Sequence, residues 1–148
     1  MFFNYSHHKV LISLFIIIFT SCADVNKNNS ISIGYPYAKI PMDGQDSVSA
    51  YMTINNLTNQ TLSIISVSCE GANMSAFHNM ILSEKDQMIR MIIEDHVNLI
   101  PNQEVIFRRG GQHLMIMGLQ DSLKNKSNIL CNFRLDNGED FPFRIKLQ

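Results

Sequence analysis

The sequence contains no tryptophan, only four prolines and no excess of either charge. Its 148 residues include 12 Lys or Arg and 13 Asp or Glu, and these are scattered along the chain. A protein that binds nucleic acid or an anionic membrane surface through charge needs a basic patch, and the sequence shows none. A specific local site must therefore carry the function, and the chain is long enough for one ordinary domain.

Helical periodicity is also missing after Ile31, because no stretch sustains apolar residues at i, i+3, i+4 and i+7. The pattern has period two instead. Val48, Ala50, Met52 and Ile54 alternate with more polar residues, as does the C-terminal segment 141–148. Gly- and Asn-rich turn signals separate the runs, so we predict that residues 31–148 form one all-β domain, a sandwich or barrel of antiparallel strands.

The N-terminal segment carries an export signal. Lys9 precedes an apolar run over residues 10–19 that is too short to span a bilayer and has the length of a signal-peptide core. The run ends in Phe19-Thr20-Ser21-Cys22, which is similar to a bacterial lipobox. We predict a signal peptide over residues 1–21 and a polar tether over residues 22–30, with lipidation of Cys22 and plain cleavage nearby both open.

Two cysteines remain, Cys69 and Cys131, in a compartment that permits disulfides. Both lie in strand-like runs, Cys69 with the same parity as Ile65 and Val67. We expect both side chains to point inward and to act as small hydrophobes. A disulfide between them stays open, because it requires a Cα separation that a sequence does not give.

The first candidate site is the segment from His113 to Met117. Alternation places His113, Met115 and Met117 on one face of a strand, and Leu114 and Ile116 on the other. Because Gly110-Gly111 forms a turn just before it, we expect His113 at the start of the strand, near the rim of the domain.

The second candidate pairs His78 with Met91 in a hairpin. If polar residues 83–86 form its loop, antiparallel pairing places His78 opposite Met91, with Cβ atoms about 4.5 to 5.5 Å apart. Two His-Met pairs then meet if the strands approach each other. Met42, Met52 and Met74 are assigned to packing, and His96 to a surface loop.

These side chains select the metal. Thioethers are soft donors that favour Cu(I), and imidazole also binds copper. Outside the cytoplasm, Met and neutral His hold Cu(I) without an oxidisable thiolate. Such neutral ligands should favour exchange over retention.

At these residues the chain resembles the PCu(A)C family of periplasmic copper chaperones. The family motif is a His, about ten residues, a Met, about twenty-one residues, and His-x-Met. Met91 and His113-Leu114-Met115 match the second half, since 21 residues separate Met91 from His113. The resemblance implies a cupredoxin-like β-sandwich with Greek-key connections and Cu(I) on His78, Met91, His113 and Met115.

The hairpin departs from the family pattern, because 12 residues separate His78 from Met91. Two extra residues preserve the facing of both strands, so we expect the site to survive. Met80 and Met88 stay open as substitutes for Met91.

The sequence shows no nucleophile-base-acid constellation and no phosphate loop, so we do not expect an enzyme. The export signal predicts a location in the periplasm or cell envelope, with a membrane reached only through a lipid on Cys22. The resemblance further implies that the protein delivers copper to a copper-accepting protein, such as a cytochrome c oxidase subunit or a thioredoxin-like assembly factor. Copper storage or resistance and a metal-free envelope lipoprotein are the alternatives. A blue-copper electron carrier needs a His₂Cys ligand set, which fits poorly with an inward-pointing Cys131.

Overall fold

The computed structural model describes residues 30–148 except residues 40, 43 and 124–125. The predicted signal peptide, Cys22 and nearly all of the tether lie outside this part of the chain. The described residues form ten strands and one 3₁₀ turn, η1 (Asp121–Leu123). No helix in this part is long and apolar enough to cross a membrane.

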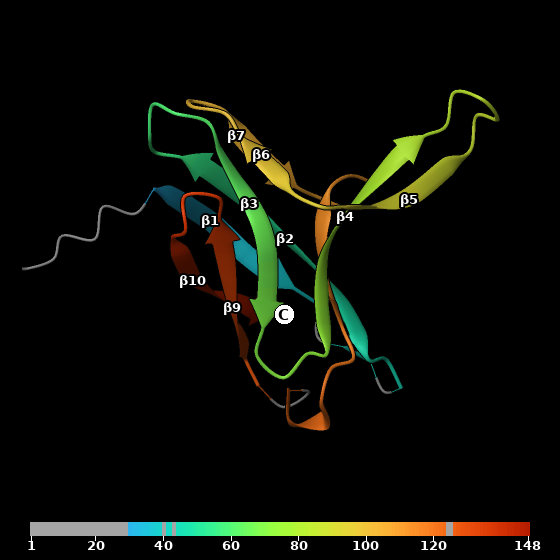
Figure 1. The fold of residues 1–148 in the computed structure, drawn as a ribbon. Helices are drawn as coiled ribbons and strands as arrows, with labels where there is room; N and C mark the ends of the chain where they lie inside the picture. The colour runs from blue at the N-terminus through green and yellow to red at the C-terminus, as the bar shows by residue number, and fades with distance from the viewer. Residues whose placement is uncertain (1–29, 40, 43, 124–125) are drawn as a thin grey trace, which may run out of the picture.

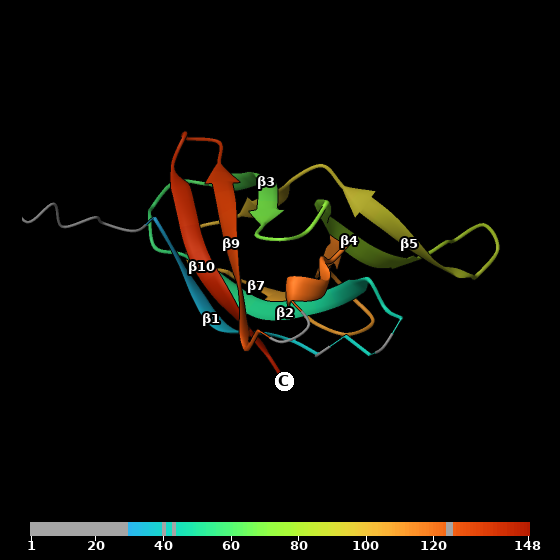
Figure 2. The same ribbon diagram turned by 90° about the horizontal axis from the view of Figure 1, so that it is seen from below.

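The strands form two layers that are joined at one side (Figures 1 and 2). The first layer has the order β5 (Ile89–Glu94), β4 (Met74–Leu82), β8 (His113–Met117) and β2 (Ser47–Asn56), with β7 (Glu104–Phe107) also paired to β2. The second layer has the order β10 (Asp140–Leu147), β9 (Asn128–Leu135), β3 (Leu62–Cys69) and β6 (Val97–Leu99). Strand β1 (Ile31–Ala38) joins them, running antiparallel to β2 and parallel to β10. The predicted all-β fold is confirmed.

The core lies between the layers and follows the predicted alternation. Every second residue of β2 is buried, from Val48 to Asn56, and the same holds for the last three apolar residues of β10. Aromatic rings connect the layers, because the ring of Phe77 on β4 lies 5.9 Å from that of Phe133 on β9. Such packing fixes β4, and with it the neighbouring His78, to the body of the domain.

Strand β3 corrects the expectation for the cysteines. A bulge between Ile64 and Ser66 reverses the alternation, so Ile65 points outward with 48% exposure while Cys69 is buried. Cys69 lies directly opposite Cys131 on β9, with Cα atoms 4.1 Å apart, and the two form a disulfide. They are buried as predicted, but they act as a covalent link between strands rather than as free small hydrophobes.

The hairpin of β4 and β5 extends beyond the rest of the domain (Figure 1). Its loop has six residues, because Leu82 pairs with Ile89, so the predicted four-residue loop is wrong. Gln87 adopts a left-handed conformation, with φ of 57°, within this longer loop. The register therefore differs from the prediction by two residues, which leaves every side chain on its predicted face.

Candidate metal centre

Strand β8 presents His113 and Met115 on the outer face of the first layer. Leu114 and Ile116 are fully buried on the opposite face, which confirms the predicted alternation. His113 begins the strand after the turn at Gly111, as predicted, but its side chain is only 5% exposed. Its Nδ1–H donates to the carbonyl oxygen of Gly111 at 2.9 Å, which leaves the Nε2 lone pair available to a metal ion.

Strand β4 runs antiparallel to β8 and brings the second histidine to the first. His78 pairs directly with His113, and their ring centroids are 5.7 Å apart. The expected approach of the two strands is confirmed.

Met91 reaches His78 from β5 by a diagonal rather than a direct pairing. The residue opposite Met91 is Met80, and the residue opposite His78 is Ile93, so the predicted register is wrong. The Met91 sulfur nevertheless lies 2.9 Å from Nδ1 of His78. Diagonal neighbours on one face are within reach of long side chains, and Met is long and unbranched.

Met115 is the next residue after His113 on the same face of β8. It pairs with Ala76 on β4. On its other side, the Ser49 hydroxyl of β2 donates to the Met115 sulfur at 3.2 Å. The strand pairing therefore places His78, Met91, His113 and Met115 on one face of three adjacent strands.

The environment of His78 favours its neutral form. His78 is 8% exposed, and its buried Nε2 has no hydrogen-bond partner within the described part of the chain. Burial lowers the pKa of His78, and the neighbouring His113 lowers it further. Both effects favour the neutral imidazole, which is the form that binds a metal ion, and its Nε2 has no partner in the described part of the chain.

For the remaining methionines and histidines, some of the predicted locations are correct and others are wrong. Met52 is buried and His96 lies in an exposed loop, as predicted. Met42 and Met74 are 69% and 52% exposed, so their assignment to packing is wrong. Met88 precedes β5 in the hairpin loop and is 61% exposed, outside the strand pairing that brings Met80 and Met91 to the site.

Sequence reasoning missed the contribution of β2. Besides Ser49, the ring of Tyr51 lies 6.4 Å from that of His113. The alternation of β2 placed both on its polar face, but only the pairing of β2 with β8 brings that face beside the histidines.

No group of three or more His, Cys, Asp or Glu side chains lies together among residues that the structure describes. Any metal ion at this face would therefore depend on imidazole and thioether donors. That set suits a soft monovalent ion and disfavours Zn²⁺, Mg²⁺ and Ca²⁺, which prefer thiolate, imidazole and oxygen ligands.

A comparison with protein families matches residues 31–147 to the LpqE-like family, described as "Putative lipoprotein LpqE-like". The chain belongs to the LpqE-like family. The match spans every strand of the domain, so this LpqE-like domain contains the whole of the candidate site. A search of curated proteins found no match.

Solved structures share the fold of this LpqE-like protein. The copper-bound PCuAC domain from PmoF2 is 18% identical, with a TM-score of 0.65, over 80% of this chain and 92% of that domain. The apo PCuAC domain from PmoF1 is 15% identical, with a TM-score of 0.65, over 80% and 93%. Cu(I)-bound DR1885 from Deinococcus radiodurans is 18% identical, with a TM-score of 0.60, over 78% and 76%. The expected cupredoxin-like sandwich is confirmed as the PCuAC fold.

Proposed function

We propose that this protein is an extracytoplasmic Cu(I)-binding metallochaperone whose ion is held by His78, Met91, His113 and Met115. The observation that carries the proposal is the grouping of Met91 with the two histidines: the Met91 sulfur lies 2.9 Å from Nδ1 of His78, the ring of His78 lies beside that of His113, and the buried Nε2 of His78 has no partner among the described residues. Met115 lies on the same face, next to His113 on β8. The PCuAC neighbours support it, since two of them are named as structures with bound copper.

The donor set suits transfer better than retention. Four neutral ligands leave the charge of Cu(I) uncompensated, so the site gives up the ion more readily than a thiolate site would. Met91 is 55% exposed, whereas the two histidines are buried. An acceptor can therefore replace the Met91 ligand first while the histidines still hold the ion, and this exposure favours delivery over storage.

The client we propose is a cuproenzyme outside the cytoplasm, most simply a copper centre of cytochrome c oxidase, reached directly or through a thioredoxin-like assembly factor. We place the protein in the periplasm or cell envelope, anchored through lipid on Cys22. The description of its family as a lipoprotein supports this location.

A competition titration tests the proposal. The reduced protein without its leader is titrated with Cu(I) against a calibrated chelator, together with the His78→Ala/His113→Ala double variant. His96→Ala, in an exposed loop, is the matched control. We expect one tight equivalent in the wild type and in the control, and none in the double variant. A wild type that binds no Cu(I) would leave a metal-free envelope lipoprotein as the better description.

A further inference from the structure

The projecting hairpin carries a concentration of exposed apolar side chains. Seven large apolar residues of β4, β5 and their loop are at least 37% exposed, namely Ile81, Leu82, Met88, Ile89, Met91, Ile92 and Ile93. An apolar patch of this kind on one element marks an interaction site more often than chance. No residue of β5 is buried by the rest of the described chain.

Three of these side chains lie on the same face of the hairpin as the candidate metal site. Leu82 pairs with Ile89, and His78 pairs with Ile93, so all four lie on the same face. Leu82, Ile89 and Ile93 are 58%, 65% and 62% exposed. The charged residues of β5 point the other way, where Glu94 accepts a hydrogen bond from Asn79. An ion entering or leaving the site on this side therefore crosses an uncharged apolar surface.

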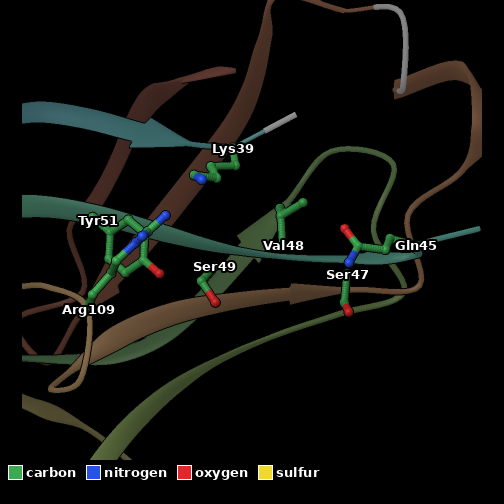
Figure 3. A pocket seen from close by; sticks show the side chains of 7 residues that line it. All are labelled: Lys39, Gln45, Ser47, Val48, Ser49, Tyr51 and Arg109. Carbon is green, nitrogen blue, oxygen red and sulfur yellow. The ribbon is translucent and has the colours of Figure 1, made fainter. Parts of the chain in front are cut away.

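A cationic hollow lies on the same face, on the other side of the site. It has a volume of about 210 Å³, and its lining includes Lys39, Ser49, Tyr51 and Arg109 (Figure 3). Figure 3 shows Lys39, Tyr51 and Arg109 gathered at one end. Because Ser49 also donates to the Met115 sulfur, the hollow and the site share a wall.

The described part of the chain supplies no counter-charge to the hollow. No Asp or Glu lines it, and neither Lys39 nor Arg109 forms an ion pair with any residue of the described ranges. The two cations of this hollow repel each other less when an oxyanion lies between them, and Arg binds a carboxylate through two parallel hydrogen bonds.

We propose that this face docks a copper-accepting protein that sets an apolar surface against Leu82, Ile89 and Ile93 and a carboxylate against Lys39 and Arg109. This docking rests on the proposed function, since it places an acceptor's ligands over Met91. The apolar contact contributes affinity, and the charge contact selects the partner and fixes its orientation.

Peptide binding tests the docking face without copper. The probe is a fluorescent peptide with leucines at one end, a His-Met copper-binding segment, and aspartates at the other end; matched peptides carry lysines for the aspartates or serines for the leucines. Anisotropy titrations use the metal-free protein without its leader. We expect the aspartate-leucine peptide to bind at least ~10-fold more tightly than either matched peptide.

Two variant pairs locate the contacts. Lys39→Glu/Arg109→Glu should reverse the preference toward the lysine peptide, while Arg144→Glu on the second layer should not. Ile89→Ser/Ile93→Ser should weaken binding at least ~5-fold. Its matched control is Ile81→Ser/Ile92→Ser, on the opposite face of the same hairpin, which should bind as the wild type does.

The proposal is overturned if the aspartate-leucine peptide fails to bind, if peptide charge has no effect, or if both hairpin variants lose affinity equally. It is also overturned if sedimentation shows a dimer that Ile89→Ser/Ile93→Ser dissociates, because a second copy would then cover the face. Cu(I) titration of the wild type separates the two proposals, since peptide binding without Cu(I) binding removes only the metallochaperone function.

Discussion

Met91 and Met80 face each other across the hairpin, and the Met91 sulfur lies 2.9 Å from Nδ1 of His78. We therefore predict that Met91→Leu weakens Cu(I) binding at least ~10-fold, while Met80→Leu has a smaller effect. Leu conserves the volume of Met and removes the donor, so folding should be little changed. Chelator competition measures both affinities, with Met88→Leu as the control.

A larger loss in Met80→Leu than in Met91→Leu would contradict this assignment. It would show that the thioether directly opposite Met91 is the true ligand, as the spacing of the sequence left open.

The protonation of His78 gives the metal-free protein a pH-dependent stability. Its pKa lies below the ordinary value of about 6.5 because of burial and the nearby His113. The unfolded chain therefore binds this proton at a higher pH than the folded chain does. The free energy of unfolding should be level above about pH 6.5 and should decrease as the pH falls from there through the lowered pKa.

Denaturant unfolding across this pH range checks the effect, in the wild type and in His78→Asn. The variant should lose part of the acid destabilisation, and His96→Asn should keep all of it. If the His78→Asn slope equals that of the wild type, this histidine is not the group responsible.

The sequence predicts which candidate ligands share a face wherever the two-residue period of a strand alone decides it. His113 and Met115 share a face because they are two residues apart, and a register error of two could not move Met91 to the other face. The contact itself was not predictable, because it is diagonal and depends on a six-residue loop with Gln87 at φ of 57°. Residues with side chains such as Gln adopt that conformation too rarely to be expected.

At the scale of elements, the turn after β8 holds the ligand strand in place. Gly118 has φ of 63°, and a Cβ there would lie 2.6 Å from the Asn73 side-chain nitrogen. Gly118→Ala should therefore destabilise the domain by more than the ~1–2 kcal/mol that a left-handed alanine costs. Gly138, with φ of 84° and open space around it, gives that strain alone.

Denaturant unfolding of Gly118→Ala and Gly138→Ala measures the difference. Equal losses of stability would mean that Asn73 moves aside freely and that this contact does not position β8.

Strands with uninterrupted alternation, such as β2 and β10, were predictable from sequence, but β3 was not. A bulge adds one residue to one strand, and nothing in the segment from Leu62 to Cys69 marks where it falls. The short strands β6 and β7 were not predictable for a different reason. Three or four residues are too few to show a period, and their pairing with β3 and β2 is decided by packing of the whole domain.

At the scale of the whole molecule, the Cys69–Cys131 disulfide joins strands 62 residues apart in the sequence. Cys69→Ala/Cys131→Ala should destabilise the domain by about 2–5 kcal/mol, since the unfolded chain regains the freedom of that loop. The disulfide lies in the second layer and the site in the first, so Cu(I) affinity should stay within about twofold of the wild-type value. Denaturant unfolding and chelator competition measure the two effects.

A loss of Cu(I) affinity in step with the loss of stability would contradict this independence of the layers. The oxidised and reduced wild-type proteins provide the control, because they differ only in the same covalent bond.

The position of the four candidate ligands has a consequence for motion. Met91 lies on β5, His78 on β4, and His113 and Met115 on β8, and within the described part of the chain β5 pairs with no strand but β4. One ion bound to all four residues would thus link β5, at the edge of the first layer, to β4 and to β8. Backbone amides of the hairpin should then exchange with deuterium more slowly when copper is bound, so that their exchange rate reports whether the protein carries its ion.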